Sequence, residues 1–144
     1  MNPEDFHRIV FESADIGIYM TAHSGRLLAV NSALSAMFGY ASPHAMLAAV
    51  GPDAAPLYAD TGQRSRLLEK MKVTGHLSND ISEMVRPDGQ RLWISESASM
   101  HAEGTTRAVM IGTVIDITAL VESQQALRAA EEEAPPLPPT EVPA

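Results

Sequence analysis

The segment from Arg107 to Glu133 constrains the fold most, because an apolar strand pattern runs directly into a helix pattern. Residues 107–115 read RAVMIGTVI; β-branched side chains are frequent and proline is absent, which predicts a central strand. Residues 119–133 contain no glycine, proline or aromatic residue, which predicts a helix. Thr118 stands where its hydroxyl would cap the first turn of that helix. A core strand that continues into an exposed helix can carry a conformational change out of a domain.

Composition limits the classes of partner and site. The 144 residues, of which 45% are hydrophobic, are enough for one domain with a single core. A formal net charge of −8 disfavours nucleic acid and anionic membrane surfaces as partners. The absence of cysteine excludes disulfides, thiolate metal sites and cysteine nucleophiles. We see no signal peptide and no apolar run of about 18 residues, so we expect a cytoplasmic protein that does not enter the membrane.

The order of local patterns predicts an α+β fold built on a five-stranded antiparallel sheet. Because the links between neighbouring strands are as short as hairpins, the sheet should be antiparallel, with the helices on one face. We expect strands at 16–22, 26–30, 77–85, 90–101 and 107–115. Helices are expected at 32–38 and 43–50, and a longer one at 60–74, opened by Asp60 and ended by Gly75.

Two flanking helices and a tail complete the expected organisation: residues 1–14 form an N-terminal flanking helix, 15–118 the domain, 119–134 a C-terminal helix and 135–144 a proline-rich linker or tail. Phe6, Ile9 and Val10 share one face of the first helix, which favours packing on its own domain or, alternatively, a dimer contact. Leu120 and Leu127 fit a coiled-coil seam, but only two heptads are present and polar residues stand at the other seam positions.

Several short strings, taken in order, resemble the PAS (Per-Arnt-Sim) sensor domain. They are FESADIGI at 11–18, NSA at 31–33 with FGY at 38–40, RPDG at 86–89 with WI at 93–94, and GTVIDIT at 112–118. The resemblance runs from about Phe6 to Asp116, with the helix that follows. It implies a PAS-like five-stranded antiparallel sheet with helices on one face, an N-terminal flanking helix and a C-terminal signalling helix.

The resemblance implies a sensory module of bacterial signal transduction, in the manner of two-component systems. Such a module would form a homodimer through its flanking helices and relay a conformational signal to an output domain or partner, such as a histidine kinase or a nucleotidyl or diguanylate cyclase. Asp116, Ile117 and Thr118 would form the relay, with the Asp116 carboxylate paired to a basic group. The alternative is that Thr118 only caps the helix and Asp116 is only solvated.

The helices and the sheet would enclose a space lined by methionines, aromatic residues and leucines. Such side chains form adaptable pocket walls but equally fill a core that holds no ligand, and core packing is the favoured interpretation. Trp93 lies on the polar side of its strand, so it is a pocket wall, a helix-packing residue or an interface anchor. The candidate lining residues are Tyr40, Met46, Leu57, Tyr58, Leu68, Met71, Met84, Trp93 and Met110.

Cofactor chemistry is restricted by the side chains that the sequence offers. Without a cysteine, cysteinyl-flavin photochemistry is excluded. Haem is disfavoured because residues 60–74 contain no histidine, which leaves His76 as the one candidate ligand. A non-covalent flavin or a small metabolite fits the resemblance, so a receptor domain is the alternative function.

Catalysis is the remote alternative. The five histidines show no metal-ligand spacing, and no catalytic motif is present, so we assign no metal site and no catalytic residue. Glu83 and Glu96 could approach each other across a hairpin, which we interpret as a surface pair of acids. The basic residues of the longest central helix are interpreted as a solvated face; they are Arg64, Arg66, Lys70 and Lys72.

Overall fold

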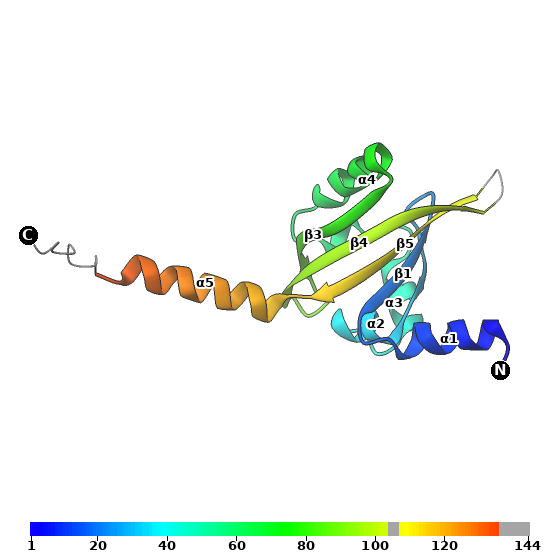
Figure 1. Cartoon of the computed structure of the whole chain (residues 1–144), viewed down its shortest axis with the longest axis horizontal. Helices are drawn as coiled ribbons and strands as arrows, with labels where there is room; N and C mark the ends of the chain where they lie inside the picture. Colours follow the sequence, from blue (N-terminus) through cyan, green and yellow to red (C-terminus); the bar gives the residue numbers. More distant parts are fainter. Residues whose placement is uncertain (104–106, 136–144) are drawn as a thin grey trace, which may run out of the picture.

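The structure is a computed structural model that describes residues 1–103 and 107–135 (Figure 1). It confirms the α+β fold and the five-stranded antiparallel sheet, whose strand order is β2-β1-β5-β4-β3. The predicted central strand, β5, lies between β1 and β4. The strands are β1 (Gly17–Ala22), β2 (Leu27–Val30), β3 (His76–Val85), β4 (Arg91–Glu103) and β5 (Arg107–Asp116).

Four helical segments lie between β2 and β3 in the sequence and form the layer against one face of the sheet. They are α2 (Ser32–Met37), α3 (Pro43–Val50), the 3-10 turn η1 (Ala55–Leu57) and α4 (Gln63–Thr74). The flanking helices are α1 (Pro3–Ser13) and α5 (Thr118–Glu133), and neither contains a buried residue. Figure 1 shows α5 continuing from the end of β5 and projecting away from the sheet. Of the predicted tail at 135–144, residues 136–144 lie outside the described residues.

Side-chain caps start three of the helices. Asn2, Asn31 and Ser42 each accept a hydrogen bond from the backbone N–H three residues further on, at the starts of α1, α2 and α3. Proline in the first turn of α1 and of α3 suits these positions, because the amide it lacks has no partner inside the helix there.

The predicted start of α4 is wrong. The helix begins at Gln63 rather than Asp60, and Gly62 precedes it without a side-chain cap. The Asp60 carboxylate instead accepts the Gly62 N–H at 2.9 Å and pairs with Arg66. The capping arrangement expected of Asp60 is therefore replaced by a local turn.

The two faces of β1 follow the chemistry of its partners rather than simple hydrophobicity. Tyr19 and Thr21 are buried toward the helices, whereas Ile16 is exposed and Ile18 and Met20 are only partly buried. On β4, the alternation with polar residues predicts one apolar face made of Leu92, Ile94, Ala98 and Met100. The first three are buried, but Met100, near the far end of the strand, is 37% exposed. The inner face of the sheet thus carries polar groups on β1 among the apolar side chains of β4 and β5.

A bulge in β3 explains why its predicted apolar face is only partly correct. The sequence pattern predicts one face made of Leu77, Ile81 and Val85. Leu77 is buried, but Ile81 is 57% exposed. The register with β4 shifts between Leu77 and Asp80, where Asn79 adopts a φ of 52°. Because side chains alternate with a period of two, the irregularity changes which residues face the helices. Beyond the bulge, Ser82 and Met84 point inward.

Candidate functional site

Glu96 is the acid at the centre of the molecule. It follows the inward alternation of β4 and is only 4% exposed. Its Oε1 accepts the Tyr58 hydroxyl at 3.0 Å, and its Oε2 accepts the Tyr19 hydroxyl. The surface-pair interpretation is therefore wrong for Glu96. Glu83 lies opposite Trp93 in the β3–β4 register and forms an ion pair with Arg91 at 2.7 Å.

A glycine on the strand between them lets Tyr19 reach Glu96. Tyr19 is on β1 and Glu96 on β4, so the tyrosine ring must pass across β5. The residue of β5 directly opposite Tyr19 is Gly112, and a Cβ atom there would overlap the tyrosine ring. Because Gly112 has no side chain, Tyr19 on β1 can contact Glu96 on β4 across β5.

Arg64 brings a cation from α4 to the same region. It is 8% exposed, and its Nη2 donates to the backbone carbonyl of Gly25 at 2.9 Å, in the turn between β1 and β2. The interpretation of the basic residues as a solvated face is wrong for Arg64, whereas the other three are partly or fully exposed. These three pair with acids and are Arg66, Lys70 and Lys72.

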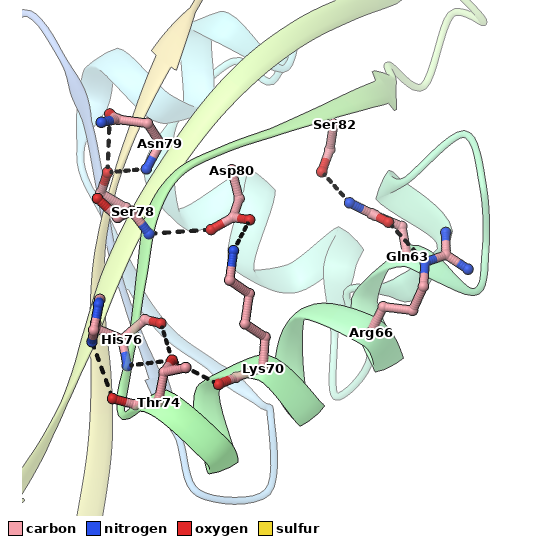
Figure 2. Close-up of polar contacts among 10 residues, drawn as sticks. Gln63, Arg66, Lys70, Thr74, His76, Ser78, Asn79, Asp80 and Ser82 are labelled. Carbon is pink, nitrogen blue, oxygen red and sulfur yellow. Dashed lines mark hydrogen bonds and ion pairs between the residues drawn. The ribbon is translucent and has the colours of Figure 1, made fainter.

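Polar contacts also join α4 to β3 (Figure 2). Lys70 Nζ lies 2.6 Å from the Asp80 carboxylate, and Gln63 Nε2 donates to the Ser82 hydroxyl at 3.0 Å. Asp80 is the cross-strand partner of Glu96. The helix that supplies Arg64 is therefore also bonded to the strand beside Glu96.

Burial sets the protonation chemistry of the cluster. It raises the pKa of Glu96, and the hydrogen bonds from Tyr19 and Tyr58 and the charge of Arg64 oppose that rise. Burial and the neighbouring Glu96 also raise the pKa of both tyrosines above its ordinary value, so both phenols remain hydrogen-bond donors at neutral pH. The cluster surrounds one acid with two phenol donors and one cation.

A cavity of about 40 Å³, as the space open to the centres of water-sized molecules, adjoins this cluster. Its polar wall is Tyr19, Thr21, Tyr58, Arg64 and Glu96. The rest of the wall is apolar and comes from both layers of the fold. These residues are Leu27, Leu34, Phe38, Met46, Ala54, Leu57, Met84, Ile94 and Val114.

The predicted lining residues divide between this cavity and other places. The cavity is lined by four of them, which are Met46, Leu57, Tyr58 and Met84. Leu68 and Met110 line a second space of about 10 Å³, which shares Tyr58, Arg64 and Glu96 with the first. The remaining three line neither cavity: Met71 is buried in the core, Tyr40 packs against it, and Trp93 lies on the other face of β4.

Tyr58 is the predicted member of the polar wall; the other four, Tyr19, Thr21, Arg64 and Glu96, were missed, although the sequence carries a signal for Glu96. Glu96 stands in phase with Leu92, Ile94 and Ala98, so period-two alternation alone places it on the buried face. Arg64 carries no comparable signal, because burial of one position on a charged helix depends on how that helix docks.

The strand-to-helix junction is bonded to β4 at Trp93. The Ile117 N–H donates to the Trp93 carbonyl at 2.8 Å, and the Trp93 N–H donates to the Thr118 hydroxyl oxygen at 3.0 Å. Asp116 Oδ1 accepts the Thr118 N–H at 2.9 Å and the Thr118 hydroxyl at 2.6 Å. The junction thus fastens the first turn of α5 to the neighbouring strand.

The capping prediction at the junction is wrong, and the ion pair expected of Asp116 is not seen among the described residues. The residue that precedes α5 in the capping position is Ile117, and no side chain caps the helix, because the Thr118 hydroxyl faces Trp93 and Asp116. Asp116 forms no ion pair within residues 1–103 and 107–135. Its carboxylate is occupied by Thr118 instead.

The remaining candidates lie at the surface. The His76 ring is exposed, with Nδ1 3.1 Å from the Thr74 carbonyl (Figure 2).

No group of three or more His, Asp or Glu side chains in the described part of the chain is arranged to hold a metal ion. None of the described helices is both long enough and apolar enough to cross a membrane. The predicted dimer residues are at least 48% exposed; they are Phe6, Ile9, Val10, Leu120 and Leu127.

Comparison with known proteins adds a family and a set of related folds. Residues 5–70 match a family described as "PAS domain". A domain of a sensory box sensor histidine kinase/response regulator from Geobacter sulfurreducens is 24% identical with a TM-score of 0.64, over 78% of this chain and 93% of that one. No curated protein matches the chain at a significant level.

Two further structures share the fold. The PAS domain of a LuxR-family transcriptional regulator from Burkholderia thailandensis, in complex with ethanol, is 21% identical with a TM-score of 0.61, over 77% of this chain and 96% of that one. An RNA-binding light-oxygen-voltage receptor is 20% identical with a TM-score of 0.71; the match covers 90% of this chain but 37% of the receptor.

Proposed function

We propose that this chain, which carries a PAS domain, is a sensory module that pairs with a second copy through α1 and α5. A change at the Glu96 cavity passes through Asp116, Ile117 and Thr118 into α5. From there it reaches an output domain or a partner protein, with a histidine kinase as the first candidate and a nucleotidyl or diguanylate cyclase as the second.

The observation that carries the relay is the short path from the cavity to the junction. In the β4–β5 register Glu96 lies opposite Val114, and Ile94 lies opposite Asp116. Both Ile94 and Val114 line the cavity. The junction therefore begins one cross-strand pair from the cavity wall, and displacement of that wall acts directly on the residues that hold α5.

Exposed apolar side chains support pairing through the flanking helices. An isolated helix of the length of α5 is marginal in water unless it packs against something, and no residue of α5 is buried in the chain itself. Leu120 and Leu127 lie seven residues apart on one helix face. Phe6, Ile9 and Val10 offer a second apolar stripe on α1.

The choice of output follows from one related protein. The Geobacter sulfurreducens structure is described as a domain of a sensor histidine kinase/response regulator. A kinase is a suitable receiver for a change in helix packing, because rotation or shift of paired helices is a common switching movement.

Light scattering of the complete chain at high micromolar concentration tests the pairing. We expect a dimer for the wild type and a monomer for the double variant Leu120→Glu/Leu127→Glu, with an unchanged circular dichroism spectrum for the sheet. The matched control, Gln125→Glu/Ala129→Glu, adds the same charge on the opposite side of α5 and remains dimeric. A monomeric wild-type chain contradicts the proposal.

The cavity supports a second candidate function, a receptor for a small metabolite. Binding sites of drug-sized ligands occupy roughly 300–1,000 Å³, against about 40 Å³ here, so a flavin would need the cavity to widen. A compact molecule does fit. An absorption spectrum and denaturing mass spectrometry of the purified protein test this candidate: a yellow protein with a released flavin contradicts the size argument, whereas a small retained metabolite supports a receptor.

A further inference from the structure

We propose that the Glu96 cavity selects a compact, uncharged molecule that carries both a hydrogen-bond donor and an acceptor, such as a short alcohol or a primary amide. This inference rests on the receptor candidate above and names the class of its ligand. Its three supports are the charge balance of the polar wall, its hydrogen-bonding capacity and the volume of the cavity.

The polar wall holds one acid and one base, whose charges balance when Glu96 is ionised. The hydrogen bonds from Tyr19 and Tyr58 and the charge of Arg64 favour that form, against the burial that raises the pKa of Glu96. Glu96 and Arg64 are both less than 10% exposed and line the same cavity, and within the cavity lining they are the acid and the base. A charged ligand would leave one charge without a partner in a buried site, and burial of an unpaired charge costs far more than burial of a neutral polar group. The wall therefore favours a neutral guest over an anion or a cation.

The polar wall can still accept hydrogen bonds from a ligand and donate hydrogen bonds to it. Each oxygen of the Glu96 carboxylate accepts one tyrosine hydroxyl, and a carboxylate oxygen has room for a second donor. The structure gives Arg64 a hydrogen bond to the Gly25 carbonyl, and a guanidinium group has five N–H donors. A ligand hydroxyl or amide can thus donate to Glu96 while its oxygen accepts from Arg64.

The volume and the opposite wall fix the size of the guest. A water molecule needs about 10–15 Å³ of such space, so a cavity of about 40 Å³ admits about three non-hydrogen atoms. Leu34, Phe38 and Met46 face the polar wall and provide apolar contact for one or two carbon atoms. Met46 can adjust to small differences in shape because its side chain is unbranched and flexible.

An NMR titration of the full-length protein with size-matched probes tests the proposal. The probes are ethanol and acetamide as neutral molecules, acetate as the anion, ethylammonium as the cation and hexan-1-ol as the larger alcohol. We expect saturable shifts of the Thr21, Glu96 and Val114 amides with dissociation constants in about the millimolar range, as suits so few atoms. Ethanol and acetamide should bind at least about tenfold more tightly than the two ions and hexan-1-ol.

Two variants locate the binding. Ala54→Leu fills the cavity and should abolish the saturable shifts. Ala48→Leu, the same substitution at an exposed position of α3, should leave them unchanged. If Ala54→Leu fails to fold, Thr21→Val replaces it in the test. This substitution removes a hydroxyl group from the polar wall without changing the volume of the side chain, and it should raise the dissociation constant for ethanol at least about threefold.

The outcomes separate this inference from the proposed function. Tighter binding of acetate, ethylammonium or hexan-1-ol overturns the ligand class. Recovery of a larger native ligand by denaturing mass spectrometry also overturns the ligand class but keeps the receptor function. The absence of saturable binding by every probe overturns the inference, while the dimer and its relay are judged by light scattering alone.

Discussion

Two buried polar residues of this domain, Asn31 and Glu96, are satisfied in opposite ways. Asn31 is 0% exposed, and its four hydrogen bonds all go to the backbone. Its amide nitrogen donates to the carbonyls of Phe11 and Ile16, and its oxygen accepts from the N–H groups of Ile18 and Leu34. One neutral side chain thereby joins the end of α1, the start of β1 and the first turn of α2.

Glu96 is bonded to other side chains instead. Tyr19 and Tyr58 donate to it, Arg64 lies on the same wall, and a cavity adjoins all of them. Side chains move more cheaply than the backbone of packed elements, and a carboxyl group can exchange its partners. Asn31 therefore fixes the positions of α1, β1 and α2 relative to one another, whereas Glu96 belongs to a part of the core that can rearrange.

The largest effect is expected from loss of the Asn31 side chain. Asn31→Ala leaves buried backbone groups without partners, which should lower the free energy of unfolding by about 3–5 kcal/mol. Urea unfolding measures this loss. Ser32→Ala is the control, because the Ser32 hydroxyl donates to the exposed side chain of Glu12. The hydrogen bond from the Ser35 hydroxyl goes to the Ser32 backbone carbonyl, which the substitution keeps. The free energy of unfolding of Ser32→Ala should change by no more than about 0.5 kcal/mol. A loss below about 1 kcal/mol for Asn31→Ala would show that the Asn31 side chain does not hold these elements together.

A smaller effect is expected where β5 makes room for Tyr19. Gly112→Ala places a methyl group against the Tyr19 ring and should cost about 2–3 kcal/mol. In a Tyr19→Leu background the overlap is relieved, so the same substitution should cost at least about 1 kcal/mol less. Equal costs in the two backgrounds, measured by urea unfolding, would show that the tyrosine is not what Gly112 accommodates.

The tyrosines also predict a loss of stability at alkaline pH. Their pKa values are higher in the folded than in the unfolded state, whose ordinary value is 10.0. Above about pH 10 the unfolded state therefore binds fewer protons, and stability falls by about 1.4 kcal/mol per pH unit for each tyrosine. Tyr40 adds to the same slope because burial raises its pKa too. Tyr19→Phe should therefore remove one tyrosine's share of the slope in unfolding curves between pH 10 and 11, whereas Thr21→Val should leave the slope unchanged. An unchanged slope for Tyr19→Phe would place the titration elsewhere.

The smallest change in stability is expected at the junction, where the Thr118 side chain contacts the backbone of β4. Thr118→Val keeps the shape but removes the bonds to Trp93 and Asp116, at a cost of about 0.5–1.5 kcal/mol. Hydrogen exchange of the Trp93 amide should accelerate about tenfold or less, since the loss is local. Ser123→Ala, on the exposed surface of α5, should leave that amide unchanged. Unaltered exchange in Thr118→Val would argue that the backbone bond from Ile117 holds the junction alone.

Local chemistry made most of the fold predictable. Caps at Asn2, Asn31 and Ser42, the left-handed Gly75 and the alternation on β4 are all determined by neighbours in the sequence. The failures share a cause that lies outside the local pattern. The bulge at Asn79 changed the phase of β3, and the room that the Tyr19 ring needs on the inner face comes from Gly112 on a different strand.

The candidate site was less predictable for the same reason. Part of its lining was predicted, because large side chains of the helical layer and inner sheet face the core; these residues are Met46, Leu57 and Met84 on the apolar side and Tyr58 on the polar wall. The polar wall joins residues from β1, α4 and β4 that are far apart in the sequence, and no spacing rule relates them. Of the polar residues that were missed, Glu96 could have been placed on the buried face from its alternation with Leu92, Ile94 and Ala98.

The connection between the Glu96 cavity and the junction is tested most directly by the backbone amide shifts of Trp93, Ile117 and Thr118. Glu96→Gln keeps the shape of the side chain and removes its charge, and the account predicts that all three amides shift, because Ile94 and Val114 join the cavity to Asp116. Glu69→Gln, the same change on the exposed surface of α4, should leave them in place. Shifts confined to the immediate neighbours of Glu96, with Trp93, Ile117 and Thr118 unchanged, would contradict the account.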